Sequence, residues 1–176
     1  NVDDTFSRSD SATTWSLSVQ KDLSEDVMLY AAAATGYKAG GFNSTSGDTG
    51  DMRNFDKTET TNFEVGIKSR LMDNKVQLNA TAFSMDTDGQ HYITQSSTGS
   101  GTIVGNATET AERLGFDLNV IAKLTSNLTL NMSYFTVDDG SPDILSNAAA
   151  RLTPDDAYTV GLSHTFPLGN GNVFSR

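Results

Sequence analysis

The stretch ETTNFEVGIKSRL, Glu59 to Leu71, decides the fold class of this chain, because its side chains alternate strictly in polarity. One face carries Thr61, Phe63, Val65, Ile67, Ser69 and Leu71, and the other carries Thr60, Asn62, Glu64, Gly66, Lys68 and Arg70. This period of two predicts a β-strand and excludes an amphipathic helix. The strand is also long, since globular strands usually have about five or six residues, whereas a tilted strand needs about 9–11 to cross a bilayer.

The same alternation recurs along the chain. It appears in residues 15–20, 59–71, 76–82, 114–120, 128–134 and 158–166, and the apolar run that continues from Val27 to Tyr37 is interpreted as a further strand. Seven strands are therefore predicted, and Val173 and Phe174 are expected to open an eighth.

The connections between these strands alternate in length. The short ones carry the Asp, Asn, Gly and Pro residues that turns require, and they are Lys21 to Asp26, Met72 to Asn74, Lys123 to Asn127 and Pro167 to Asn172. The long polar ones are Lys38 to Lys57, Asp86 to Thr108 and Asp138 to Pro154. Regular alternation of this kind is typical of outer-membrane barrels. We predict an all-β, antiparallel transmembrane β-barrel segment of about 7–8 strands, with short periplasmic turns and long extracellular loops.

The charges within the predicted strands agree with this interpretation. Glu64, Lys68, Arg70 and Asp117 all fall on polar faces. A Lys or Arg at the bilayer midplane of the apolar face would cost about 2–4 kcal/mol, whereas a lumen position tolerates it. A wet lumen also explains the low hydrophobic content of 36% and the mean hydropathy of −0.36, because only one face of each strand has to be apolar.

Composition excludes several other classes of protein. The formal net charge of −10 argues against nucleic acid as a partner, since phosphate binding requires a basic patch. There is no cysteine for a disulfide framework or a thiolate metal site. No nucleophile elbow, phosphate loop or paired-His motif is present, so we expect no enzyme and no catalytic or cofactor-binding residue. The chain begins at Asn1 without Met or a signal peptide, and we expect a piece of a larger protein.

Candidate ligand-binding residues lie in the predicted outer loops, where binding residues concentrate. The segment GYKAGGFN, Gly36 to Asn43, follows an apolar run, and Tyr37 and Phe42 are expected near the outer interface. The full set of candidates is Tyr37, Lys38, Phe42, Arg53, Phe55, His91 and Tyr92. The competing interpretation is an aromatic girdle with loop packing for the first five residues, and an ordinary loop pair for His91 and Tyr92.

No metal site is predicted. His91 is a lone histidine in its loop, whereas zinc needs three or four convergent ligands. Asp48, Asp51 and Asp56 cluster in one loop, but their spacing matches no calcium-binding motif. A solvated acidic loop explains them.

Several segments together resemble TonB-dependent outer-membrane receptors. These are GYKAGGFN, the long FDKTETTNFEVGIKSRLMDNKVQLNATAFSMD (Phe55 to Asp86), LGFDLNV (Leu114 to Val120) and FPLGNGN (Phe166 to Asn172). Within the long segment, Glu59–Thr60, the step Phe63 to Gly66, Lys68–Ser69 and the return-strand pair Ala82–Phe83 are similar to the family pattern. The order and spacing of these segments carry the resemblance, which covers roughly residues 12–176.

The resemblance implies a middle-to-late piece of the family's barrel of about 22 strands. Residues 1–176 would form one partial barrel domain, without the plug domain or the rest of the barrel. The whole protein would be an active-transport receptor for a scarce nutrient such as a ferric siderophore or a similar metal chelate. Its partners would be outer-membrane lipid, that small-molecule chelate and, through the absent N-terminal region, the TonB complex. No cofactor is implied.

Two other architectures remain open at this point. Eight strands can close a small barrel with a structural or adhesin role. In that case Glu64, Lys68, Arg70 and Asp117 would have to pair inside it. A soluble extracellular β-sandwich is the third alternative. It predicts a protein that is soluble without detergent, and the bare apolar faces argue against it.

Overall fold

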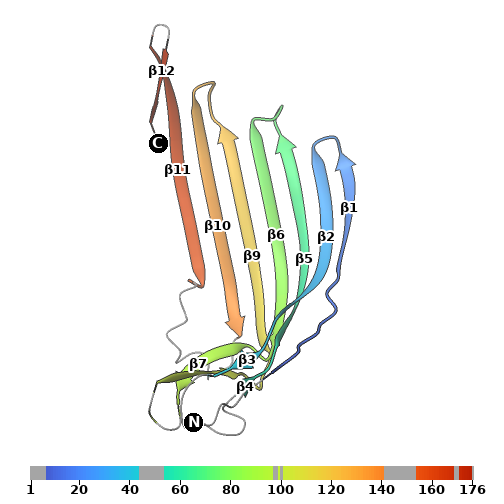
Figure 1. The fold of residues 1–176 in the computed structure, drawn as a ribbon. Helices are drawn as coiled ribbons and strands as arrows, with labels where there is room; N and C mark the ends of the chain where they lie inside the picture. Colours follow the sequence, from blue (N-terminus) through green and yellow to red (C-terminus); the bar gives the residue numbers. More distant parts are fainter. Residues whose placement is uncertain are drawn as a thin grey trace.

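The computed structural model describes residues 7–43, 54–96, 99, 101–140, 154–168 and 171–175. Every regular element within these ranges is a strand, so the predicted all-β class is confirmed (Figure 1). Among the same residues, no helix is long and apolar enough to span a membrane.

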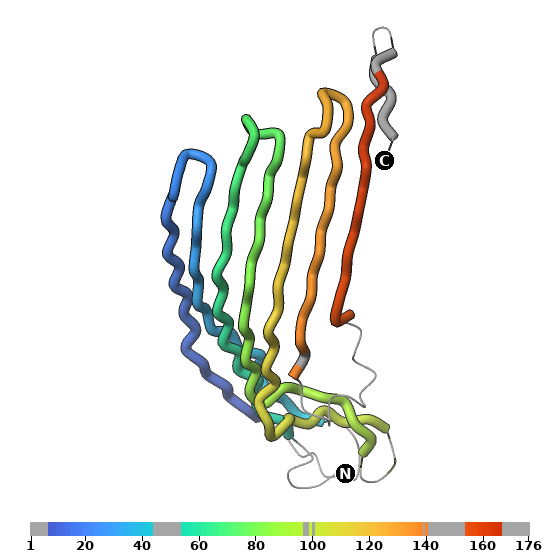
Figure 2. Tube along the Cα trace, turned by 180° about the vertical axis from the view of Figure 1, so that it is seen from behind, coloured from blue at the N-terminus to red at the C-terminus, as the bar shows by residue number. Residues whose placement is uncertain are grey.

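Eight strands form one antiparallel, curved sheet (Figures 1 and 2). Their spatial order is β1-β2-β5-β6-β9-β10-β11-β12, so that each strand pairs with the next sheet strand along the chain. They are β1 (Ser16–Ser24), β2 (Val27–Lys38), β5 (Thr58–Leu71), β6 (Val76–Asp88), β9 (Ala111–Lys123), β10 (Leu128–Gly140), β11 (Asp156–Leu168) and β12 (Gly171–Ser175). The prediction of seven strands and an eighth is confirmed, and the sheet does not close on itself: β1 and β12 are its two edges.

Two long connections contain strands that the sequence did not predict. The first holds β3 (Gly41–Phe42) paired with β4 (Asn54–Phe55), and the second holds β7 (His91–Gln95) paired with β8 (Thr102–Asn106). The long polar connection predicted from Asp86 to Thr108 therefore contains a short hairpin. Backbone hydrogen bonds between two short strands order this segment, although it lacks a long alternating pattern. Both hairpins lie at the end of the sheet opposite the short turns (Figure 1).

Strand register separates the side chains onto two faces. One row of directly paired residues runs Val19, Ala31, Val65, Ala82 and Phe116 across five strands. The adjacent row runs Gln20, Tyr30, Gly66, Thr81 and Asp117. Because successive residues of a strand point to opposite sides, the first row belongs to an apolar face and the second to a polar face. The alternation predicted from sequence is thus preserved across the sheet.

The apolar face has no protein cover in the described part of the chain. Large side chains on it are solvent-accessible, with 58% exposure at Val65, 63% at Val160 and 81% at Tyr158. On β5 the apolar positions run from Phe63 to Leu71, which corresponds to about 26 Å along the strand. Among the described residues, the buried apolar side chains are Ile103, Ala107, Ala111, Ala122 and Val137, and they are too few and too dispersed to form a globular core in this sheet.

Candidate functional site

The hairpins β3–β4 and β7–β8, together with residues 8–11, form one connected group that we call the loop layer. Two asparagine side chains join its parts. Asn43, just after β3, donates from Nδ2 to the Val104 carbonyl over 2.9 Å and accepts the Val104 amide over 2.8 Å. Its carboxamide therefore bonds to β8 as a neighbouring strand would, and ties the first hairpin to the second.

Asn106 makes the second tie. Its Nδ2 donates to the carbonyl oxygens of Asp56 (2.9 Å) and Gly89 (2.7 Å), while its Oδ1 accepts the Asp56 amide (2.6 Å). His91 Nε2 donates to the same Asp56 carbonyl over 2.7 Å. Since a carbonyl only accepts, this ring nitrogen carries a proton. One side chain on β8 thus holds the end of β4 and the start of β7 together.

Charged groups fasten the N-terminal part of the loop layer. Arg8 contacts Asp10 at 2.8 Å and Asp56 at 2.9 Å, and the Asp10 carboxylate also accepts the Gly40 amide over 3.0 Å. Hydrogen bonding from Arg8 lowers the pKa of the Asp10 carboxyl, and the bond to Asp10 raises the pKa of Arg8. Asp10 is therefore held as an anion between a guanidinium and a backbone amide.

The structure brings two of the predicted ligand-binding residues into contact and separates the others. Phe55 and His91 meet edge to face, with ring centroids 4.9 Å apart, and Phe55 lies opposite Gly41. Tyr92 lies opposite Gly105 and packs against Ala107 and Ala111.

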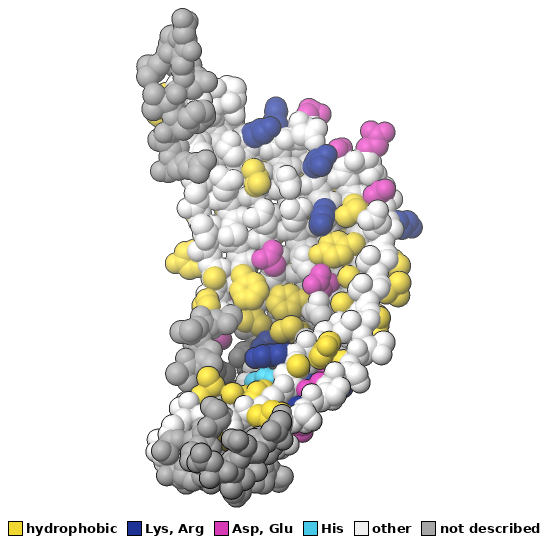
Figure 3. All heavy atoms as spheres, in the orientation of Figure 1, with side chains coloured by type: hydrophobic (Ala, Val, Ile, Leu, Met, Phe, Trp, Pro, Cys, Tyr) yellow, Lys and Arg dark blue, Asp and Glu magenta, His cyan; other side chains and the backbone are white. Residues whose placement is uncertain are grey.

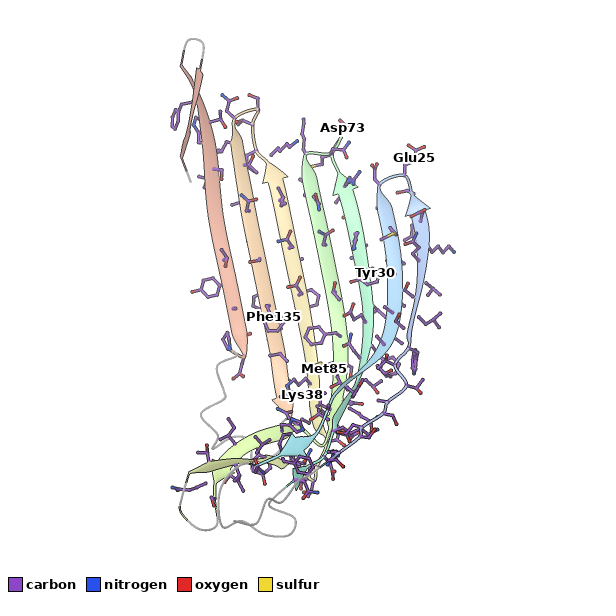
Figure 4. The ribbon with its side chains drawn as sticks, viewed as in Figure 1. Glu25, Tyr30, Lys38, Asp73, Met85 and Phe135 are labelled. Carbon is purple, nitrogen blue, oxygen red and sulfur yellow. The ribbon has the colours of Figure 1, made fainter. Side chains whose placement is uncertain are left out.

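Tyr37 and Lys38 point to opposite sides of the sheet. Tyr37 pairs with Glu59, and by strand register both residues lie on the apolar face of the sheet. Tyr37 is 47% exposed. Lys38 pairs with Thr58 on the polar face and lies at the loop end of the sheet (Figure 4). Phe42 is exposed on β3. Arg53, like Asp48 and Asp51, lies outside the described residues.

The polar face carries a set of interstrand contacts midway along the sheet. Tyr30 on β2 reaches across β5, and its hydroxyl is 2.7 Å from Thr81 Oγ1 on β6. The Lys68 ammonium lies 5.3 Å from the centroid of the Tyr30 ring. Phe83 and Phe135 stack with centroids 6.1 Å apart. Figure 4 shows Tyr30 and Phe135 between the short turns, marked by Glu25 and Asp73, and the loop end near Lys38.

The charged residues on this face do not neutralise one another. In the part of the chain that the structure describes, Glu64, Lys68, Arg70 and Asp117 form no ion pair with each other. Glu64 instead accepts a hydrogen bond from Asn62 (2.9 Å). Figure 3 shows charged side chains of both signs spread over the strands, with hydrophobic side chains grouped among them. Such a surface provides sites for several hydrogen bonds and ion pairs to a polar partner.

Both regions present hydrogen-bonding, charged and aromatic side chains. Over the described ranges, no group of three or more His, Asp or Glu side chains could hold a metal ion. The sequence indicated no structural role for Asn43, Asn106, Arg8 or Asp10, which organise the loop layer. Most of their hydrogen-bond partners are distant in sequence, with separations from 30 residues for Asp10 with Gly40 to 61 residues for Asn43 with Val104. The Arg8–Asp10 and Asn106–Gly89 bonds are closer in sequence. A local sequence pattern could therefore not have identified the long-range contacts.

Comparison with known proteins places these features in a family. Residues 1–175 match the family described as TonB dependent receptor-like, beta-barrel. Three solved structures are similar in fold. The ferric yersiniabactin uptake receptor FyuA from Yersinia pestis has a TM-score of 0.70 and 18% identity, over 90% of this chain and 24% of that one. The ferripyoverdine receptor of the Pseudomonas aeruginosa outer membrane has a TM-score of 0.60 and 14% identity, over 88% and 20%.

The third is the copper transporter OprC, with a TM-score of 0.63 and 15% identity, over 85% of this chain and 23% of that one. The matched region thus spans about a quarter or less of the length of each of these three proteins.

Proposed function

The chain belongs to the TonB-dependent receptor β-barrel family, and from this premise we propose that the whole protein is an outer-membrane receptor that imports a scarce metal chelate, energised by the TonB complex. Residues 1–176 form part of its barrel domain. The main support for the proposal is the antiparallel sheet with one apolar and one polar face, in a chain that matches this family over residues 1–175. The chelate is a ferric siderophore or a similar complex, since the similar structures include two iron receptors and a copper transporter.

The two faces support a position in the outer membrane of a Gram-negative bacterium. The apolar face contacts lipid, because an apolar band of about 25 Å is what such a barrel presents to the bilayer. The polar face lines the lumen, where water or a plug contacts Lys68 and Glu64. The short turns face the periplasm and the loop layer faces outward.

The loop layer and the upper lumen wall form the proposed ligand vestibule. Phe42, Phe55 and His91 supply ring surfaces on the loop layer, and Lys38 supplies a cation at the loop end of the lumen. Arg53 and Tyr92 stay in the proposal as candidates. Tyr37 fits an aromatic girdle instead, because it shares the face that carries the apolar band.

The open sheet favours a large receptor over a small closed barrel. An eight-stranded barrel would pair its first and last strands, whereas β1 and β12 are both edges here. The lumen charges also lack the mutual pairing that a narrow interior would require. An antibody to this segment, applied to detergent-extracted outer membranes, should detect a polypeptide several times larger than 18.8 kDa. A band near 18.8 kDa would reject the receptor in favour of the small barrel.

Uptake experiments test the function itself. Cells that express the full-length gene under iron limitation should accumulate radioactive iron from at least one ferric siderophore. Cells without the gene, or without TonB, should not. The same assay with a copper chelate assigns the metal. Equal uptake of every tested chelate with and without the gene would overturn the proposal.

A further inference from the structure

A groove runs along the apolar face over β1, β2, β5 and β6, the strands coloured blue to green in Figure 2. It consists of two hollows of about 610 Å³ and 240 Å³, which share Val19, Ala31 and Val65 in their linings. Ala80 and Ala82 also line the larger hollow. These alanines are smaller than the Val, Ile, Leu and Phe residues around them, which explains why the surface is hollowed here.

The length of the groove matches one leaflet of a membrane. The larger hollow reaches Lys21, and the smaller one reaches Leu17 and Phe63. Lys21 and Leu17 are four positions apart on β1, which corresponds to about 13 Å along the strand. Half of a hydrocarbon core that is about 30 Å thick is about 15 Å. A single extended acyl chain would therefore fill the groove from its headgroup level toward the bilayer centre.

One cation lies at the short-turn end of the groove. Lys21 pairs with Leu29, so its side chain belongs to the apolar face. Within the described part of the sheet, it is the only Lys or Arg on that face. It also forms no ion pair there. The acidic residues on the same face all lie toward the loop end, and they are Glu59, Asp86, Asp88, Glu112, Asp138 and Asp156.

We propose that this groove binds one anionic phospholipid from the periplasmic leaflet. An acyl chain occupies the hollow over Ala31 and Ala80, and the headgroup phosphate pairs with Lys21. A basic residue near the membrane surface attracts anionic lipid, and the acidic residues at the opposite end disfavour the reverse orientation. The inference rests on the proposed position of the apolar face in the outer membrane, but not on which chelate is imported.

Photolabelling of the full-length receptor tests the site. The receptor is placed in phosphatidylcholine nanodiscs that contain some phosphatidylglycerol with a diazirine in its acyl chain. After irradiation, labelled peptides are quantified by mass spectrometry. We expect labels to concentrate on the β1, β2 and β5 peptides that contain Val19, Leu29 and Val65. Labelling spread evenly to the β11 peptide with Val160 would overturn the proposal.

Two variants separate the headgroup from the acyl chain. Lys21→Gln should lower labelling of the groove by diazirine phosphatidylglycerol about fivefold, and leave labelling by diazirine phosphatidylcholine unchanged. Lys123→Gln, on the polar face at the same end of the sheet, is the matched control and should have no effect. Ala31→Leu fills the groove and should lower labelling by both lipids, whereas Val160→Leu should lower neither. An unchanged Lys21→Gln result would overturn the headgroup contact.

Other occupants give distinct results. If excess inorganic phosphate abolishes the effect of Lys21, a free anion binds there and the lipid proposal fails. If Ala31→Leu converts an oligomer to a monomer on size-exclusion chromatography, a second copy covers the groove and the proposal also fails. Chelate uptake by the same variants should stay normal. If the unmodified receptor imports none of the tested chelates but its groove is labelled as expected, the proposed function fails and the lipid site stands.

Discussion

Replacing Gly66 with alanine should destabilise the barrel wall through its effect on Tyr30. The two residues face each other across β2 and β5, and the Tyr30 ring lies over Gly66. A Cβ added at Gly66 would lie 2.4 Å from this ring. The ring would have to move away, which would separate its hydroxyl from Thr81 and its face from Lys68.

The magnitude follows from the contacts that would be lost. The Tyr30–Thr81 hydrogen bond contributes about 0.5–1.5 kcal/mol, and the Lys68 cation–π contact about 0.5–1 kcal/mol. Alanine also restricts the unfolded chain relative to glycine, which favours folding by about 0.5–1 kcal/mol in a strand. Gly36→Ala is the matched control, because Gly36 lies on the polar face of β2 and a Cβ added there would have no atom within 4 Å. The backbone contribution is common to both variants, so Gly66→Ala should be less stable than Gly36→Ala by about 1–2.5 kcal/mol.

The free energy of unfolding is measured on the full-length receptor in detergent micelles, by urea titration followed by circular dichroism. The same pair of alanine variants is then made in a Tyr30→Ala background. There, Gly66→Ala should behave like Gly36→Ala, because the clash has been removed. The reasoning would be refuted by equal stabilities of the two alanine variants with Tyr30 present, or by an unchanged difference without it.

Three further predictions concern the faces and the loop layer. Val65→Lys, on the apolar face of β5 and two positions farther from the short turns than the Lys21–Leu29–Ile67 row, should destabilise the membrane-inserted barrel by about 2–4 kcal/mol, whereas Ala32→Lys on the polar face should not; urea titration in vesicles compares them. Arg8 lowers the pKa of the Asp10 carboxyl, so the Asp10 carboxylate should accept the Gly40 amide fully at pH values above the ordinary aspartate pKa of about 3.9. This hydrogen bond should be lost as the pH falls through the lowered pKa of the folded protein. Hydrogen exchange at Gly40 should show this loss, and Asp10→Asn should remove the pH dependence. Asn106→Ala removes three hydrogen bonds, and should increase hydrogen exchange in residues 54–58 without changing exchange in β9 and β10.

The sheet could be predicted from sequence because its faces are determined locally. Most of the long strands show their apolar side by alternation, although β2 (VMLYAAAATGYK) does not. A shift of one residue would expose the side chains of an alternating strand to the wrong environment. Short turns then leave little freedom in the pairing of neighbouring strands. For this reason Phe63, Val65 and Ile67 all lie on the predicted face, and Val173 and Phe174 lie in an eighth strand.

The loop layer could not be predicted by the same reasoning. β7 and β8 have 5 residues each, too few for alternation to be distinctive. Their stability depends on partners distant in sequence, such as Asn43 with Val104. Residue type therefore identified Phe55, His91 and Tyr92 as notable, but not the packing in which each one takes part. The sequence also did not reveal that Tyr37 and Lys38, which are adjacent in the chain, lie on opposite faces of the proposed membrane wall.

One arrangement joins the wall and the loop layer. Four aromatic residues each lie directly opposite a glycine on a neighbouring strand: Tyr30 with Gly66, Phe83 with Gly115, Tyr92 with Gly105, and Phe55 with Gly41. In each pair a Cβ on the glycine would lie less than 3.0 Å from the ring, so the ring covers the backbone of its neighbour. An aromatic residue that covers a glycine on the neighbouring strand helps to fix the register of the two strands. Rings held flat on the polar face would project less into the proposed lumen, and would leave room there for a plug and for a passing chelate. Gly66 and Gly115 therefore allow the polar face of this sheet to carry the large Tyr30 and Phe83 rings close to its backbone, as a wall around the proposed transport path would require.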